Sequence, residues 1–253
     1  SGPSGCDNQC GSTLIFDECG VCDGDNTSCA DCAGVPNGDS WESDCGCVAA
    51  DNDGNDCDDE CGVPNGGGPA DNFTCDGTFK PETKDDLQSA VDLWTSNNSS
   101  ALSTYGEINS WDVSLITSMS HLFKDKTTFN DDISSWDVSN VTTMERMFQN
   151  ATNFNGDISS WDVSNVTNIS SMFRQSAFNQ DLNSWDVSSV THMREVFQQA
   201  TDFNGDVSGW DVSSVIDMAY MFTWAHAFNG DVSGWDVSSV TRMTHLFRKA
   251  YDF

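Results

Sequence analysis

The sequence has 253 residues, a mean hydropathy of −0.43 and a formal net charge of −30, from 40 Asp and Glu against 10 Lys and Arg. This charge argues against binding to nucleic acid or to an anionic membrane, because both need Lys and Arg to neutralise phosphates. The longest cysteine-free apolar run of the first region, Leu14 to Phe16, is far shorter than the ~20 residues that span a bilayer, so we expect no direct membrane insertion.

The first predicted domain, residues 1 to 79, holds all eleven cysteines and seventeen Asp and Glu, with no Lys or Arg. Its apolar residues are too few for an ordinary core, and Gly, Asn and Pro turn residues separate the cysteines. We therefore predict a small irregular module held by disulfides, which indicates an extracellular or cell-surface protein. Because eleven is odd, one cysteine is unpaired or pairs with another chain. The predicted disulfide cysteines are Cys6, Cys10, Cys19, Cys22, Cys29, Cys32, Cys45, Cys47, Cys57, Cys61 and Cys75.

A zinc site is the alternative use of these cysteines. Cys19-x-x-Cys22 and Cys29-x-x-Cys32 have the pattern of a four-thiolate site. The six-residue spacer between the two pairs is short, and a zinc site would leave the other cysteines unexplained. Disulfides are therefore the favoured interpretation.

The stretch "DNDGNDCDDE", residues 51 to 60, alternates oxygen ligands around a glycine, as hard Ca²⁺ sites do. An EF-hand is excluded, because Ala49 would occupy the first ligand position and Cys57 would lie inside the loop. The stretch resembles thrombospondin type 3 repeats, in which Asp-rich segments and cysteines wrap Ca²⁺. A solvated acidic loop is the alternative. The resemblance implies calcium ligands at Asp51, Asp53, Asp56 and Asp58, and a second, weaker site at Asp23 and Asp25.

Residues 80 to 110 are predicted to form a helical N-terminal cap. The stretch "TKDDLQSAVDLW" spaces four apolar residues for one helix face, and Thr83 can cap the helix with Asp86 three residues later. A stack of repeats would otherwise expose its first apolar layer, so we expect a structural role. The four apolar residues are Leu87, Ala90, Val91 and Trp94.

Residues 111 to 253 contain the motif Trp-Asp-Val-Ser six times, and successive copies are 25, 25, 24, 25 and 25 residues apart. This period predicts an α/β repeat solenoid of about six coils, the last one incomplete. Within a coil we predict a short strand around Ile133 to Val138 and a short helix over residues 142 to 150. Strands of successive coils would pair in parallel.

The constant residues of the repeat have structural interpretations with functional alternatives. The Trp of each coil is predicted to lie in the core rather than in a sugar-stacking platform. The Asn after each core Phe, such as Asn155, is predicted to have a buried amide that bonds the backbone of its own and the next coil. The Asp of each Trp-Asp-Val-Ser, such as Asp137, is predicted to cap backbone N–H groups rather than to form a column of cation ligands.

We predict no catalytic site. The four histidines, His121, His192, His226 and His245, occupy different repeat positions, and no Ser-His-Asp arrangement can be assembled from repeated positions.

The segments "YGEINSWDVSLITSMSHLF" and "FNGDISSWDVSNVTNISSMF" resemble BspA-type leucine-rich-repeat surface proteins, and the resemblance covers about residues 84 to 253. It implies leucine-rich-repeat-like coils and a surface or secreted location, often linked with adhesion. Trp and Met stand here where many leucine-rich repeats have Leu.

Sequons for N-linked glycosylation are frequent, and in a eukaryotic source we expect glycans at several of them. The candidate positions are Asn26, Asn72, Asn97, Asn98, Asn140, Asn150, Asn165 and Asn168.

The favoured function is a non-catalytic extracellular structural protein, a rigid rod in a coat, filament or appendage held by contacts with identical or related chains. The repeat stops at Phe253, halfway through a unit, so we expect either a fragment or head-to-tail docking of the open coil. The alternative is a cell-surface adhesin or receptor that binds glycan or protein through one face of the repeats.

Overall fold

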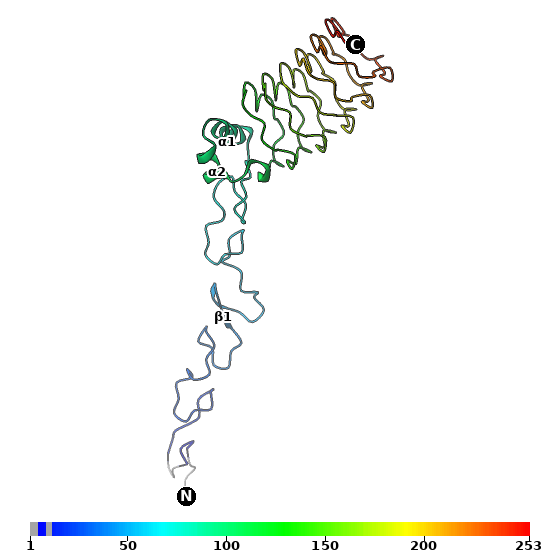
Figure 1. Cartoon of the computed structure of the whole chain (residues 1–253). Helices are drawn as coiled ribbons and strands as arrows, with labels where there is room; N and C mark the ends of the chain where they lie inside the picture. Colours follow the sequence, from blue (N-terminus) through cyan, green and yellow to red (C-terminus); the bar gives the residue numbers. More distant parts are fainter. Residues whose placement is uncertain (1–4, 9–11) are drawn as a thin grey trace. The chain divides into compact units, whose positions relative to one another are not determined.

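The structure is a computed structural model that describes residues 5–8 and 12–253 and divides the chain into two compact units, Ser1–Ala70 and Asp71–Phe253 (Figure 1). The boundary lies earlier than the composition predicts. Phe79 is buried in the second unit, where its ring packs 4.4 Å from Tyr105 and 5.2 Å from Trp111. The last part of the predicted acidic module therefore belongs to the repeat unit.

Small hairpins make up most of the first unit. Its two regular strands, β1 (Trp41–Ser43) and β2 (Gly46–Val48), pair antiparallel, with Trp41 opposite Val48. Three further hairpins each contain a single antiparallel bridge, Phe16 to Cys22, Ala30 to Pro36 and Asp58 to Pro64. Several apolar side chains of these hairpins remain exposed, as expected for a segment with too few of them to form a core.

The second unit begins with the predicted cap helix. Helix α1 (Lys84–Ser96) has the predicted capping box between Thr83 and Asp86, and its predicted apolar face is buried. The predicted helix, its capping box and its apolar face are therefore confirmed. A second helix, α2 (Asn98–Tyr105), follows directly, with Asn97 as its N-cap, and a 3₁₀ turn, η1 (Ile108–Ser110), leads into the first coil.

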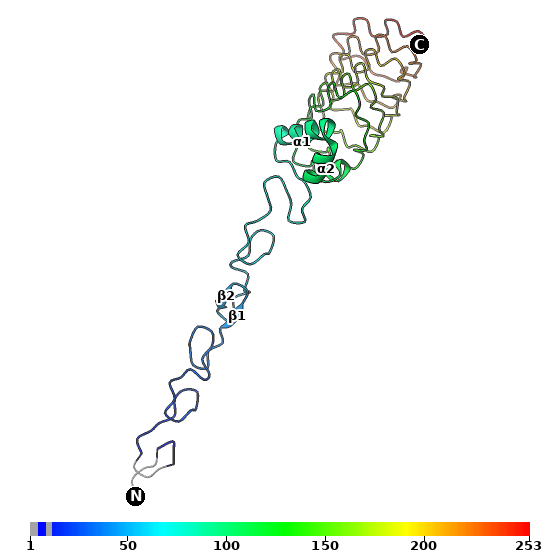
Figure 2. The ribbon, with the colours of Figure 1, turned by 60° about the vertical axis from the view of Figure 1, so that its left-hand side comes forward.

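Residues 111 to 253 form coils that lie side by side, from the cap helices to the red end of the chain (Figures 1 and 2). Single parallel bridges join successive coils, and they link residues 24 or 25 positions apart in one continuous series. The bridged residues are Ser118, Thr143, Asn168, His192, Asp217 and Arg242.

The predicted strand and helix within a coil are both wrong. Residues 133 to 138 lie in and around a turn, in which the N–H of Trp136 donates to the Ile133 carbonyl. Residues 145 to 150 form consecutive turns instead of a helix, and alternate N–H groups donate to the next coil, as Phe148 does to Met172 at 2.9 Å. The parallel pairing thus occupies the segment for which a helix was predicted.

Left-handed residues explain why this segment is not helical. Arg146 and Asn150 have φ values of 56° and 59°, and the equivalent pair recurs in every coil. An α-helix needs φ near −63° at each residue, so a left-handed residue at every fourth position turns alternate N–H groups out toward the neighbouring coil. We call these stretches the ladder segments. They are residues 118–126, 143–151, 168–176, 192–200, 217–225 and 242–250.

Two columns of Phe rings fill the core of the stack. One column contains Phe148 and Phe173, whose ring centres are 5.8 Å apart, and the other contains Phe154 and Phe178, 6.0 Å apart. Within one coil the two rings also stack, at 3.9 Å for Phe148 and Phe154. Each coil therefore buries its aromatic rings against the coils on both sides, which a single coil could not do.

Candidate functional site

The disulfides of the first unit form two interlocked pairs with the same order. Cys6 pairs with Cys22 while Cys19, which lies between them, pairs with Cys29. Cys32 likewise pairs with Cys47, and Cys45 pairs with Cys57. Cys61 and Cys75 are also disulfide-bonded, and Cys10 lies outside the described residues. The thiolates that a zinc site would need are thus used in disulfides at Cys19, Cys22, Cys29 and Cys32.

An Asp organises each of three hairpins. One oxygen of Asp31 accepts from the N–H of Val35 at 2.9 Å, and the other accepts from the N–H of Ser40 at 3.0 Å. Asp17 and Asp59 make the equivalent bonds four and nine residues ahead. Sequence reasoning did not single out these carboxylates. The signal was the motif D-x-x-G-V-x-x-G, which occurs at residues 17, 31 and 59.

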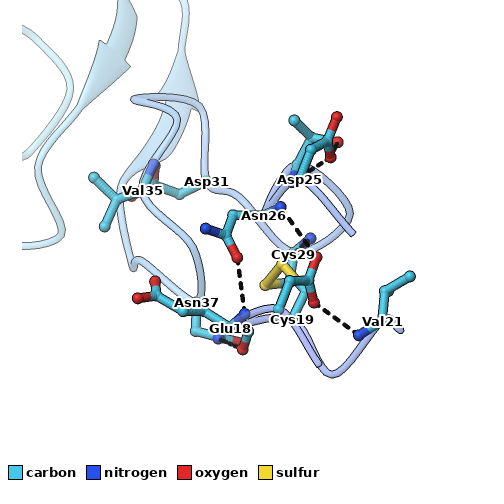
Figure 3. The surroundings of a disulfide bond; sticks show 11 residues. Glu18, Cys19, Val21, Asp25, Asn26, Cys29, Asp31, Val35 and Asn37 are labelled. Atoms are coloured by element: carbon cyan, nitrogen blue, oxygen red, sulfur yellow. Dashed lines mark hydrogen bonds between the residues drawn. A yellow bond between two sulfur atoms is a disulfide. The ribbon is translucent and has the colours of Figure 1, made fainter. Parts of the chain in front are cut away.

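Figure 3 shows how one such hairpin joins its neighbour beside the Cys19–Cys29 disulfide. The amide oxygen of Asn26 accepts from the N–H of Glu18 at 2.8 Å, and the Asn37 side chain donates to the Glu18 carbonyl at 2.7 Å. A disulfide and short hydrogen bonds therefore stabilise this hairpin pair, as an apolar core stabilises larger domains.

We expect the second glycine of the hairpin motif to be indispensable. A Cβ on Gly66 would collide with the Asp59 carboxylate, whereas one on Gly67 would meet no atom within 4 Å. Gly66→Ala should therefore destabilise this hairpin by about 1–3 kcal/mol through overpacking, and Gly67→Ala is the matched control. Hydrogen exchange at the Gly68 amide, which donates to Asp59, is the measurement. Equal exchange rates in the two variants would contradict this interpretation.

The predicted calcium residues are only partly brought together. Asp53 and Asp58 line a hollow of about 350 Å³ together with Glu42 and Asp44. Asp51 and Asp56 are exposed and do not line it. At the second predicted site Asp25 accepts from the N–H and hydroxyl of Thr27, and these bonds lower the pKa of its carboxyl. Asp23 is exposed in a left-handed conformation.

Among the described residues, one group of three His, Cys, Asp or Glu side chains has ligand atoms within 4.8 Å of one another, namely Cys45, Cys57 and Asp58. The two cysteines are bonded to each other, so they offer no thiolate to a metal. This group therefore supports the disulfide interpretation rather than a metal centre.

The repeated Trp side chains lie in the core of the coils, as predicted. Trp161 is 4 % exposed, and its indole N–H donates to the Ile133 carbonyl of the preceding coil at 3.2 Å. The Trp of each later coil makes the equivalent bond. The rings of these inner residues are thus covered and unavailable for stacking on a sugar.

The repeated Asn residues join one coil to the next. The amide oxygen of Asn155 accepts from the N–H of Asn179 at 2.8 Å, and this bond recurs along the column. The predicted backbone bond to the next coil is confirmed. The amides are exposed rather than buried, because the column runs along the outside of the turn that follows the core Phe.

Each Asp of Trp-Asp-Val-Ser caps the following turn. The carboxylate of Asp162 accepts from the N–H of Ser164 at 3.1 Å and from its hydroxyl at 2.6 Å. A second Asp column, represented by Asp157, accepts from the N–H of Ser159 at 3.0 Å. Backbone capping, the favoured interpretation for the Asp of Trp-Asp-Val-Ser, is confirmed, and the second Asp column makes the same kind of bond.

These caps predict a pH dependence of stability. The bond from the Ser164 side chain lowers the pKa of Asp162 below its ordinary value of 3.8. A carboxylate with a lowered folded-state pKa adds stability above the unfolded-state pKa, and this stability is lost as the pH falls through the folded-state pKa. Asp162→Asn should therefore be less stable than the wild type at pH 7, and the gap should close below about pH 4. Urea unfolding at several pH values measures the gap, and a gap independent of pH would refute the charged cap.

The ladder segments contain many of the side chains that vary in chemistry from coil to coil. There the ammonium of Lys249 lies 3.6 Å above the Trp224 ring, and the Arg194 guanidinium lies 5.0 Å from the Tyr220 ring centre. Glu195 pairs with Arg194 at 2.8 Å. Sequence reasoning missed this surface, because it placed a helix here.

The histidines do not gather into one site. His121, His192 and His245 lie on ladder segments of different coils, and His226 lies on another turn. Burial, followed by the charge of Arg146, lowers the pKa of His121.

The sequons differ in how far their side chains are engaged. Asn98 is exposed at the start of α2, and Asn97 caps that helix. Asn140 and Asn165 are exposed, but each side chain also donates to a Ser carbonyl of the preceding coil at 2.8 Å. Asn150 donates to Asp125, while Asn26 and Asn72 accept from backbone N–H groups and Asn168 accepts from Ser170.

This geometry defines the class of the protein as a stacked-coil repeat protein with a helical cap and disulfide-linked hairpins. The family described as "Mycoplasma protein of unknown function, DUF285" matches residues 91–189 and 174–253. These matches cover more than half of the chain, and the protein belongs to this family. The match is consistent with the resemblance to BspA-type surface repeats. No curated protein and no solved structure matches the chain significantly.

Two observations bear on location. Within the described residues, no helix has both the length and the apolar character needed to cross a membrane. The many disulfides and the surface-repeat family fit an extracellular protein.

Proposed function

We propose that the protein is a non-catalytic extracellular structural protein, whose coils form a leucine-rich-repeat-like solenoid that serves as a rigid subunit of a surface coat, filament or appendage. One observation carries this proposal: the recurring side chains of the coil are engaged in joining coil to coil. The indole of Trp161, the amide of Asn155 and the ring of Phe173 each contact a neighbouring coil. Residues used in this way build a rod rather than a reactive site.

The test of this proposal is the assembly state of the full chain. Analytical ultracentrifugation and electron microscopy of the secreted protein should show ordered assemblies of repeated subunits. Isolated monomers at all concentrations and salt conditions would overturn it.

An adhesin or receptor is the second candidate, and the ladder segments favour it. Many side chains there vary from coil to coil, and variation on one face of a repeat array is typical of a binding surface. A monomeric protein that binds a glycan array or a host protein through these segments would support this candidate over the first.

Calcium binding belongs to the proposal as a stabiliser of the first unit. The acids that line the hollow near β1 and β2 carry negative charges that repel one another, and a hard divalent cation would relieve this repulsion. We expect chelator to lower the melting temperature of the first unit by several degrees and Asp53→Asn to abolish this shift. An identical melting curve with and without chelator would refute the proposal that calcium stabilises the first unit.

N-linked glycans are proposed on exposed sequons of the second unit. Asn98 is the favoured site, because it is exposed and does not cap the helix as Asn97 does. Glycopeptide mass spectrometry of material from a glycosylating host tests this assignment.

A further inference from the structure

The charges of the coils are segregated by sign. Within residues 111 to 253 every Lys and Arg lies on a ladder segment, while the rest of this region contains fourteen Asp and no Lys or Arg. The cations are Lys124, Lys126, Arg146, Arg174, Arg194, Arg242, Arg248 and Lys249. A chain with a net charge of −30 thus concentrates its positive charge on one side of its coils.

The ladder cations exceed the acids beside them. The four acids of the ladder segments each pair with a cation, and these pairs are Lys124–Asp125, Arg146–Glu145, Arg194–Glu195 and Arg242–Asp217. Arg248 and Lys249 are exposed, and Lys249 packs on an aromatic ring rather than against a carboxylate. We call the side chains that the ladder segments expose the ladder surface. This surface therefore has a net positive charge, and it also presents the aromatic rings of Tyr220 and Trp224.

The first unit has the complementary surface. It contains no Lys or Arg, and acids such as Glu18, Asp39 and Asp44 are exposed. Apolar side chains lie exposed in the same hairpins, with Ile15 at 76 % and Phe16 at 60 %. Carboxylates fixed close together by disulfides repel one another, and a cationic partner with aromatic rings would offset this repulsion and cover the apolar side chains.

We infer that the ladder surface binds the acidic first unit of a second copy of this chain. The inference rests on the proposed structural function and specifies the contact that would hold the assembly. Complementary charge within a single sequence favours association between copies. Salt screens the repulsion between like charges that lie more than ~8 Å apart, whereas oppositely charged patches in contact still attract each other.

Zero-length carbodiimide cross-linking of the full-length protein tests this contact. It joins Lys to a nearby carboxylate, so a mixture of ¹⁴N-labelled and ¹⁵N-labelled copies distinguishes contacts between chains from contacts within one chain. We expect cross-links of mixed isotope composition from Lys124, Lys126 or Lys249 to acids of residues 12–70. Cross-links confined to a single isotope would overturn the inference, because the partner would then be the same chain.

A matched pair of triple variants provides the second readout. Arg146→Gln, Arg248→Gln and Lys249→Gln together remove three charges from the ladder surface and should weaken association at least tenfold. Ser189→Asp, Ser214→Asp and Ser239→Asp change the net charge equally at exposed positions outside the ladder and should leave association unchanged.

The outcomes separate the two proposals. If ordered assemblies form equally well with both triple variants, the inference fails while the structural function stands. If the wild type stays monomeric, the structural function fails, and salt-sensitive binding of an added anionic polysaccharide by those monomers would then assign the ladder surface to adhesion.

Discussion

We expect reduction of the disulfides to unfold the first unit and to leave residues 84 to 253 folded. Each native disulfide in a small loop-rich module contributes about 2–4 kcal/mol, and this unit has few buried apolar residues to replace them. The coils from the cap helix onward contain no cysteine and hold a continuous buried core. The loss of order should therefore be confined to one unit.

Limited proteolysis with and without reductant, followed by mass spectrometry, measures this effect. The reduced protein should be cut throughout residues 12 to 70, while a resistant fragment from about the cap helix to the last coil persists. An oxidised sample in the same buffer is the control. Degradation of both units on reduction would show that the coils depend on the disulfide module.

Truncation of a core ring in the middle of the stack should be the most destabilising change within the coils. Phe173 is fully buried and its ring lies 5.8 Å from Phe148, 5.6 Å from Phe197 and 4.1 Å from Phe178. Phe173→Ala should cost about 3–5 kcal/mol, from the lost burial and the cavity left between three rings.

A Phe of the last coil supplies the control. Phe253 is 51 % exposed and stacks on rings from one side only, so Phe253→Ala should cost much less than Phe173→Ala. Urea unfolding followed by Trp fluorescence compares the two variants. Equal destabilisation would contradict the dependence of each coil on its neighbours.

Predictions from the sequence succeeded where one local chemical preference decided the outcome. Thr83 and Asp86 form the capping box that their spacing predicts, and Asp162 caps its turn as a carboxylate beside a Ser does. Large aromatic residues such as Trp161 had no other means of burial than a neighbouring coil.

Predictions failed where the same spacing of apolar residues fits both a helix and a series of turns. Met144, Met147, Phe148 and Ala151 are spaced for a helix face, and a succession of turns places them on one side equally well. No glycine marks the left-handed residues, since Arg146 and Asn150 occupy them. Helix α2 was missed because the stretch "NSSALSTY" contains few strong helix formers, although Asn97 is a good N-cap.

The acidic module shows the same ambiguity for function. Carboxylates beside glycines are typical both of Ca²⁺ loops and of turns in which the carboxylate accepts backbone N–H groups. Asp17, Asp31 and Asp59 belong to the second kind, and only their common eight-residue motif distinguishes them in the sequence.

Hydrogen exchange by NMR at the Trp indoles and the ladder amides of the full-length protein tests the central claim most directly, namely that the repeated residues serve to join coil to coil. The indole N–H groups of Trp161, Trp185 and Trp210 donate to buried carbonyls of the preceding coil, and that of Trp136 donates to the Ile108 carbonyl of η1. The backbone N–H groups of Phe148 and Phe173 donate to the following coil. We expect these N–H groups to exchange slowest in the chain and to lose protection together on unfolding. Fast exchange of the inner Trp indoles, at the rate of an exposed side chain, would contradict it.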